Sequence, residues 1–357
     1  MKATVNVEWI DCAKGLGILL VVYGHVARGL VSSKIMADDI VFRSIDAIIY
    51  AFHMPLFFFV SGIFFISSLE RRGRGGLFLN KIDTILYIYA IWSIIQGSIE
   101  VALSSVTNGH ATWMDVAKSL WEPRGQFWFL FALFFIFCIS IIIYRRDRTS
   151  SALLALALGT SVYFSQKLYS PAPTLGYITS NFVFFAIGVA FNKWGPRFEK
   201  MVTARLIFYV ALFVATQALI YLMTGVERGQ ADLRSLTLAL LGIASTLSIS
   251  VLAARSQQRW LITVGAMSMS IFLMHIIAGS GARVILSRYA GISNEYIHLV
   301  VGFGFAVMVP IVAVKLLPRM GLGFLFGPPK FIAVSNRARF TSGPPLSAGE
   351  RPRPDES

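Results

Sequence analysis

Charged residues are scarce in this sequence. Only 14% of its 357 residues are Asp, Glu, Lys or Arg, whereas 56% are hydrophobic. A soluble protein of this size would carry closer to a quarter charged residues, roughly twice the share found here. The composition therefore excludes an ordinary soluble globular domain and predicts an all-α polytopic membrane protein.

Cysteine and acidic residues are also few. Cys12 and Cys138 both fall in or beside apolar segments, which argues against a disulfide framework. The 18 acidic residues stand against 32 Lys and Arg, a net charge of +14. The basic residues lie in short clusters between apolar runs, as in the loops of membrane proteins, and not on one face as nucleic-acid binding requires. We therefore expect no nucleic-acid partner, and no metal site.

Long apolar runs recur along the chain, and they predict about ten transmembrane helices. With the N-terminus inside, roughly two thirds of the Lys and Arg residues fall on the inner side, so both termini are expected in the cytoplasm. We find no inverted internal repeat of the kind that marks many transporters. The predicted spans are 10–30, 45–66, 83–103, 126–144, 151–166, 176–192, 206–224, 235–253, 261–281 and 297–317.

The chain is expected to divide near residue 317. Residues 1–317 contain all the apolar runs and form the predicted transmembrane domain. Residues 318–357 are basic and rich in Gly, Pro and Ser, a composition that cannot bury a core. This tail is predicted to be disordered on the cytoplasmic side.

The first apolar stretch is unusual because it holds five ionisable side chains, which are costly inside a membrane and mark functional sites: Glu8, Asp11, Lys14, His25 and Arg28. Lys14 and His25 are eleven residues apart and so share one helix face, about 16 Å apart along the axis. Asp11 precedes Lys14 by one turn and is expected to orient or pair with it. The two ends of this face are spaced to hold one long substrate.

Three histidines fall in the outer half of three different spans. They are His25, His53 and His275, and their matched depth predicts a shared polar cavity. Imidazole is the usual general acid or base near neutral pH. His53 alone is equally well explained as a packing residue that bonds to backbone. His110 and His298 lie in a loop and at a span edge, where we expect solvent-side residues without an assigned role.

Other candidate residues have two readings each. Ser61, beside Gly62, is small enough to let another helix approach closely. Arg124 and Trp128 lie at a membrane boundary, either as an aromatic belt with a snorkelling arginine or as a platform for a sugar. Arg71 and Arg74 lie in a glycine-containing inner loop, where they either set topology or clamp phosphate.

Four segments of the chain resemble the membrane-bound acyltransferase 3 family, and within it the fucose 4-O-acetylase-like group of polysaccharide O-acetyltransferases. The opening EWIDCAKGLGILLVVYGH fits the family's basic-residue-x10-His motif through Lys14 and His25. FHMPLFFFVSG, which contains His53 and Ser61, is the next strongest match. QFWFL and SIFLMH resemble the family's fourth-span aromatic motif and its late histidine segment.

The resemblance implies transfer of an acyl group, most often acetyl, from cytoplasmic acetyl-CoA or another acyl-CoA to a carbohydrate hydroxyl. It also implies a multi-pass protein among the lipids of a bacterial inner membrane. The family's catalytic histidine corresponds to His25, and its basic partner to Lys14. An RxxR feature corresponds to Arg71 and Arg74, which with Lys14 would hold the coenzyme. The oligomeric state is not predicted.

The remaining candidates are assigned by position. His53 and Asp11 join His25 as catalytic candidates, and the acceptor would contact Arg124, Trp128, His275 and Ser61. A rival hypothesis is a proton-coupled small-solute transporter in which the three histidines relay protons. A non-catalytic membrane scaffold is a third, but it leaves the buried charges unexplained.

Overall fold

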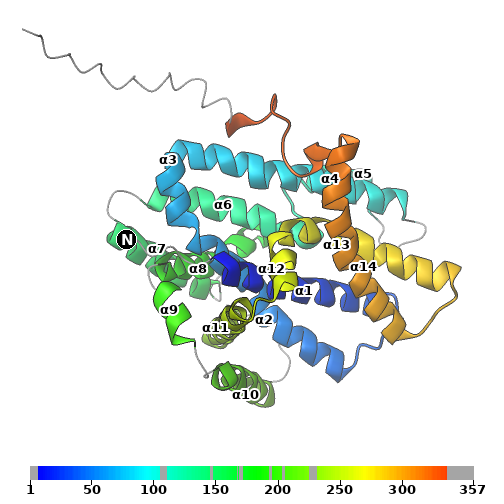
Figure 1. The fold of residues 1–357 in the computed structure, drawn as a ribbon, viewed down its shortest axis with the longest axis horizontal. Coiled ribbons are helices and arrows are strands. Elements are labelled where there is room, and N and C mark those ends of the chain that lie inside the picture. Colours follow the sequence, from blue (N-terminus) through cyan, green and yellow to red (C-terminus); the bar gives the residue numbers. More distant parts are fainter. Residues whose placement is uncertain are drawn as a thin grey trace, which may run out of the picture.

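The computed structural model describes residues 7–104, 111–144, 148–166, 168, 172–192, 195–202, 206–224 and 231–335. All of its regular elements over these ranges are helical (Figure 1). The α-helices are α1 Val7–Ser32, α2 Ile40–Ile63, α3 Phe65–Lys81, α4 Tyr87–Ala102, α5 Trp113–Lys118, α6 Trp128–Ile143, α7 Arg148–Ser165, α8 Pro173–Phe191, α9 Gly195–Met201, α10 Leu206–Thr224, α11 Leu233–Arg255, α12 Arg259–Ala266, α13 Ser268–Val284 and α14 Glu295–Leu316. Short π-helices span Ile82–Leu86 (η1) and Ile285–Tyr289 (η3), and 3-10 turns span Gly125–Phe127 (η2), Leu317–Met320 (η4) and Gly323–Leu325 (η5).

Eight helical segments among the described residues are long and apolar enough to cross a membrane. They confirm an all-α polytopic membrane protein. The two other expected spans are also helical. Span 151–166 coincides with α7, an apolar helix shorter than these eight segments, and span 206–224 coincides with α10. The side of the membrane on which the termini lie stays a prediction.

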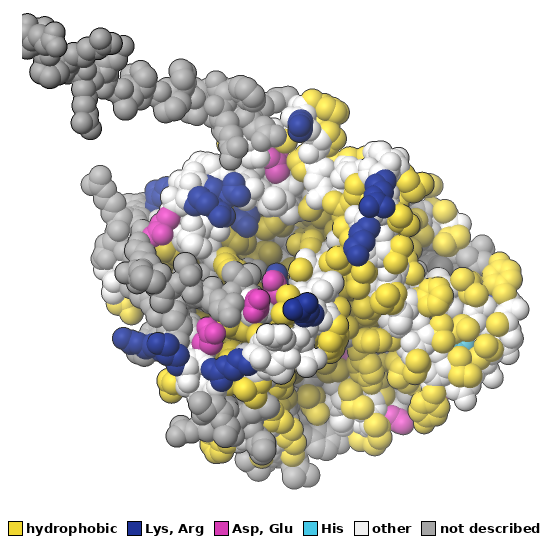
Figure 2. All heavy atoms as spheres, in the orientation of Figure 1, with side chains coloured by type: hydrophobic (Ala, Val, Ile, Leu, Met, Phe, Trp, Pro, Cys, Tyr) yellow, Lys and Arg dark blue, Asp and Glu magenta, His cyan; other side chains and the backbone are white. Residues whose placement is uncertain are grey.

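The surface of the protein is largely hydrophobic, as the composition of the chain leads us to expect. Lys and Arg side chains form a few separate groups on the face shown in Figure 2, and hydrophobic side chains cover much of the remainder. On α14, Val300, Met308 and Val312 are each about half exposed or more. In water such a helix face would be costly, whereas lipid tails accommodate it. The apolar exterior therefore fits a bilayer as solvent.

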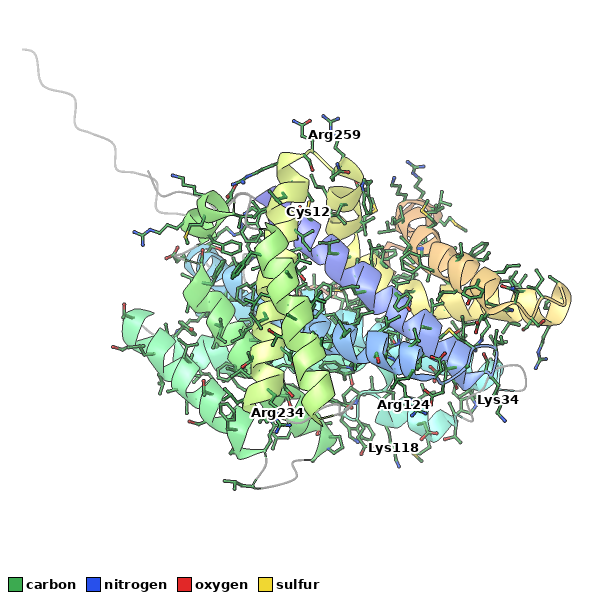
Figure 3. The ribbon with its side chains drawn as sticks, turned by 90° about the horizontal axis from the view of Figure 1, so that it is seen from below. Cys12, Lys34, Lys118, Arg124, Arg234 and Arg259 are labelled. Carbon is green, nitrogen blue, oxygen red and sulfur yellow. The ribbon has the colours of Figure 1, made fainter. Side chains whose placement is uncertain are left out.

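Basic residues separate toward two ends of the bundle. Figure 3 shows Arg259 close to Cys12 near one end, and Lys34, Lys118, Arg124 and Arg234 toward the other. Helix α1 runs between these ends, so its first turn and its last turn face opposite sides of the membrane. This arrangement is the one that the predicted spans require.

Helix α1 is the central element of the bundle. It packs against α2, α11, α12, α13 and α14 (Figure 1). Many of its apolar side chains are almost fully buried, among them Ile10, Ile18 and Val22. Because α1 has neighbours on several sides, the polar residues in its middle, such as His25, lie among other helices. The most polar of the predicted spans thus occupies the position where burial of polar groups can be compensated.

Close helix crossings hold α1 and α2 in place. A Cβ atom added at Gly265 of α12 would overlap the carbonyl oxygen of Asp11 on α1, so the two backbones touch there. Gly62 of α2 meets the Phe185 carbonyl of α8 in the same way. This confirms the expectation that small residues after His53 let another helix approach.

The expected inner loop around the arginines is helical instead. Helix α3 covers Phe65–Lys81 and continues through η1 into α4, with a single non-helical residue at Gly73, whose φ is 67°. Glycine adopts this positive φ at little cost, so α3 consists of two helical pieces that meet at a kink at Gly73. Arg71 and Arg74 therefore lie on a kinked helix and not on a flexible loop.

The beginning of the predicted tail is also folded. Trp92 Nε1 donates to the Leu325 carbonyl at 2.7 Å, and the backbone N–H groups of Val334 and Ser335 donate to the Asp83 carboxylate at 3.1 and 2.9 Å. Asp83 is buried by this segment. The expectation of disorder from residue 318 onward is thus wrong as far as Ser335. Residues 336–357 lie outside the described residues.

Candidate functional site

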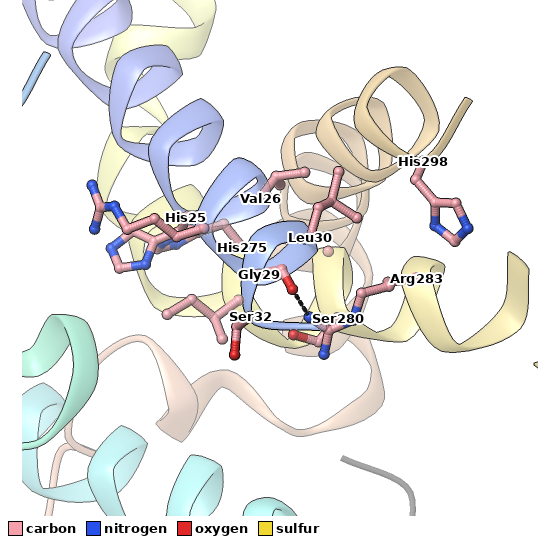
Figure 4. A pocket seen from close by; sticks show the side chains of 12 residues that line it. His25, Val26, Gly29, Leu30, Ser32, His275, Ser280, Arg283 and His298 are labelled. Atoms are coloured by element: carbon pink, nitrogen blue, oxygen red, sulfur yellow. Dashed lines mark hydrogen bonds between the residues drawn. The ribbon is translucent and has the colours of Figure 1, made fainter. Parts of the chain in front are cut away.

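A cavity of about 280 Å³ lies beside the second half of α1. Its walls come from α1, α13 and α14 (Figure 4). His25 and His275 lie together at one end, and Arg283 and His298 lie toward the other. Ser32, at the last turn of α1, lines the cavity and is exposed, so the cavity reaches the surface at the end of α1 away from Lys14.

The rings of His25 and His275 are in contact at one end of the cavity. Their ring centroids are 5.0 Å apart and the rings meet edge-on. The Nδ1 atom of His275 is within hydrogen-bond distance of the Ile271 and Phe272 carbonyls, at 3.1 and 2.8 Å. A carbonyl can only accept, so Nδ1 carries the proton and neutral His275 presents an unprotonated Nε2. That Nε2 atom is buried and has no hydrogen-bond partner among the described residues.

His25 itself is only partly buried, because its ring borders the cavity. Its electrostatic neighbours are His275, Arg28 and His53. The structure therefore brings together the three histidines of matched depth, although His53 is not part of the cavity lining. A histidine that borders a cavity has the access to a substrate proton that a general base needs.

His53 is held from two sides. Its Nδ1 donates to the Ile49 carbonyl at 2.7 Å, which fixes the tautomer, and its ring meets that of Tyr50 at a centroid distance of 4.7 Å. This bond satisfies one ring nitrogen through the backbone of its own helix. His53 is thus both a packing residue and an electrostatic neighbour of His25.

Arg28 connects His25 to helix α2. Its Nε donates to Asp46 Oδ1 at 2.8 Å, its Nη1 donates to the Tyr50 hydroxyl, and its guanidinium lies 3.6 Å from the centroid of the Tyr50 ring. The Asp46 side chain is 2% exposed and the Arg28 side chain 26%, so the carboxylate is withdrawn from water and the guanidinium only partly. A buried ion pair with additional hydrogen bonds fixes geometry more than it adds stability.

Removing the charge of Asp46 should destabilise the protein. In Asp46→Asn, Arg28 keeps its positive charge inside the bundle without a counterion, a loss we place at about 1–3 kcal/mol because Arg28 is partly solvated. We expect a lower melting temperature in detergent, measured by intrinsic fluorescence. Asp38→Asn is the matched control, since it breaks the exposed Arg43–Asp38 pair. Equal melting temperatures for the two variants would show that burial of the Asp46 pair is unimportant.

The other predicted residues lie at the start of α1 and around α3. Lys14 Nζ pairs with Asp11 Oδ1 at 2.6 Å, as the one-turn spacing predicted. Arg74 Nη2 donates to the Tyr144 carbonyl at 2.9 Å and so braces the end of α6. Arg71 is exposed. Lys14 and Arg71 therefore retain donors that could meet an anionic ligand, whereas part of the Arg74 guanidinium is occupied.

The expected acceptor residues do not converge on His25, with the exception of His275. Arg124 lies 3.6 Å from Glu100 and is exposed. Trp128 stacks on Tyr177 with ring centroids 5.0 Å apart. Neither residue, nor Ser61, belongs to the cavity lining. Their proposed contacts with an acceptor stay predictions.

Some residues around the cavity had no assigned role in the sequence analysis. Arg28 was noted as an ionisable residue of the first span, and its spacing of three residues from His25 places the two on one helix face. Asp46 and Arg283 had no signal beyond being charged residues near span ends. His298 was expected on the solvent side, and this is wrong: it is 1% exposed, and it lines the cavity. His110 lies outside the described residues.

A family model described as an acyltransferase domain, Acyl_transf_3, matches residues 7–315. The chain belongs to the acyltransferase 3 family. The match contains every described residue of the cavity and both close helix crossings, so the geometry above is that of an acyltransferase domain.

One curated relative of this acyltransferase is the nodulation protein NolL of Mesorhizobium japonicum. It is 26% identical over 187 residues, which cover 51% of this chain and 47% of NolL. The similarity thus spans about half the length of each protein. No solved structure matches the chain. The fucose 4-O-acetylase-like subgroup stays a prediction.

The described residues around the cavity do not form a metal centre. Among the residues that the structure describes, no three His, Cys, Asp or Glu side chains come together in a way that would hold an ion. Both cysteines are free. The chemistry available around the cavity is that of imidazole, guanidinium and hydroxyl groups.

Proposed function

We propose that the protein is an integral-membrane O-acyltransferase that moves an acyl group, acetyl in the first instance, from acyl-CoA to a carbohydrate hydroxyl. The observation that carries this proposal is the position of His25. It is accessible from a cavity, surrounded by polar partners, and located on a helix whose opposite end bears Lys14. Membership of an acyltransferase family gives that histidine a reaction to catalyse.

In this reaction the acyl group moves from sulfur to oxygen, and one proton moves from the acceptor hydroxyl to the coenzyme thiolate. His25 would accept the proton of the acceptor hydroxyl as its oxygen attacks the thioester carbonyl. The new C–O bond forms, the C–S bond breaks, and the proton passes from His25 to the coenzyme thiolate. His275 would support this step, because its unprotonated Nε2 can accept a hydrogen bond beside the His25 ring.

Donor and acceptor would approach His25 from opposite ends of α1. Lys14 lies eleven residues before His25, about 16 Å along the helix axis, and would meet the coenzyme phosphates together with Arg71 and the free donors of Arg74. The cavity lies on the other side of His25 and reaches the surface at Ser32, so it suits the acceptor. With the N-terminus in the cytoplasm of a bacterial cell, the donor would come from inside and the acceptor from outside.

Radiolabelled acetyl-CoA tests this function. The purified protein in lipid vesicles would be given the labelled donor and a carbohydrate extract of the host cells. We expect label in the carbohydrate fraction, stable to gel filtration and released by mild alkali as an ester would be. Label that stays on the coenzyme with every acyl-CoA tried, together with solute uptake by the vesicles, would support a transporter instead.

A further inference from the structure

Arg283 is a cation of the cavity whose charge is not matched. It lies on α13, is half-buried, and its Nη1 donates to the Gly29 carbonyl at 2.5 Å. Within the described ranges no carboxylate pairs with it. Arg28, the other arginine of the lining, is neutralised by Asp46. A partly buried guanidinium that has only a neutral carbonyl as partner is set up to receive an anion.

His298 gives the same part of the cavity a hydrogen-bond acceptor. Its Nε2 donates to the Ile292 carbonyl at 2.8 Å, so Nδ1 of the neutral ring is unprotonated. Nδ1 is buried and has no partner among the described residues. Buried polar atoms are almost always hydrogen-bonded in a complete assembly, and an exception in a cavity points to a ligand.

The guanidinium is within reach of the reacting centre. Gly29, whose carbonyl it contacts, follows His25 by four residues, which is about 6 Å along α1. Figure 4 shows Arg283 and Ser280 between the His25–His275 pair and His298. One acceptor molecule can therefore contact His25 with a hydroxyl and Arg283 with a charged substituent.

We propose that this acyltransferase acts on an anionic acceptor, and that Arg283 binds the carboxylate or phosphate of that sugar. Sugar hydroxyls donate to His298 Nδ1 and to His275 Nε2, while the guanidinium of Arg283 donates to the anion. The inference rests on the proposed function. It moves the acceptor subsite from Arg124 and Trp128 to the space between α1, α13 and α14.

Charge-separated acceptor pools test the proposal. A host carbohydrate extract would be divided by anion exchange into neutral and anionic pools, and each would be given labelled acetyl-CoA with the protein. We expect label mainly in the anionic pool. Prior reduction of carboxylates, or prior phosphatase treatment, then tells which anion is recognised. Label confined to the neutral pool would overturn the inference, and label in no pool would contradict the proposed function itself.

Variants of Arg283 locate the effect. Arg283→Gln should raise the KM for the anionic pool by about tenfold to a hundredfold, the range expected for loss of a charge-assisted hydrogen bond. The KM for acetyl-CoA should not change. Arg283→Lys, which keeps the charge, should retain the preference for the anionic pool and shows whether folding is intact. Arg288→Gln is the matched control, because Arg288 is exposed on the same helical segment and outside the cavity.

Two results would contradict the role of Arg283. One is an equal rise in KM for neutral and anionic acceptors in Arg283→Gln, which would make the residue structural. The other comes from comparing vesicles of phosphatidylglycerol with vesicles of phosphatidylcholine. It would be a loss of transfer in Arg283→Gln that occurs only in phosphatidylglycerol vesicles and is the same for neutral and anionic acceptors. A lipid phosphate, and not the sugar, would then be the anion bound.

Discussion

Replacing His25 with Ala should lower the rate of acyl transfer by about two to four orders of magnitude, the usual contribution of a general base. The reason is that no other described residue of the cavity has both an accessible ring nitrogen and the position next to His275. The measurement is single-turnover transfer of labelled acetyl to carbohydrate, at saturating acetyl-CoA. The protein should still be inserted and folded, because His25 is only partly buried.

His110→Ala is the matched control for His25→Ala. The sequence places His110 in a loop between two predicted spans, and we expect its removal to leave the rate within twofold of the unmodified protein, roughly the level of an unrelated surface change. Transfer that persists at full rate in His25→Ala would exclude His25 as the base. The neighbouring imidazoles His53 and His275 would then be the next candidates.

Replacing Gly265 with Ala should have the largest effect on stability. The added methyl group would overlap the carbonyl oxygen of Asp11, and a backbone carbonyl cannot move aside as a flexible side chain can. Overpacking of a core costs about 1–3 kcal/mol, and a backbone clash at a helix crossing belongs at the upper end or beyond. We expect a clear fall in melting temperature and poor recovery of monodisperse protein in detergent.

Gly304→Ala provides the comparison for Gly265→Ala. Gly304 lies within α14, and nothing lies within 4 Å of a Cβ added there. Alanine favours a helix over glycine by about 1 kcal/mol, so this variant should be as stable as the original or more so. If both variants melted at the same temperature, the α1–α12 crossing would be less tight than the structure shows.

The length of the apolar runs predicted the helices well. Inside a bilayer no water is present to bond with backbone N–H and C=O groups, and a helix pairs these groups within one segment. Run length could not predict α3, since its Arg- and Gly-rich sequence has no apolar run. It also missed the contacts of Asp83 with Val334 and Ser335, because a carboxylate that binds backbone N–H groups leaves no pattern in the sequence.

The sequence predicted the level of the site residues along their helices, but not the side of each helix on which they face a neighbour. Counting residues placed His25 and His275 at one level, and the structure brings their rings together. For Trp128 the same counting left two alternatives, an aromatic belt or a platform for a sugar, and in the structure its ring stacks on Tyr177 and does not line the cavity. Which way a residue faces depends on how each helix is rotated in the bundle. That rotation follows from tertiary contacts such as the Gly265 crossing, which single-sequence periodicity does not reveal.

The link between Asp83 and the far end of the chain sets an order of events during synthesis. Asp83 leaves the ribosome 251 residues before Val334, the first of its two backbone donors. Throughout translation of the intervening helices, this carboxylate has to be satisfied by water, by the insertion machinery or by a proton. The segment around the third span thus completes its packing only after translation has passed α14 and reached Ser335, and a truncation before residue 334 would remove that final step.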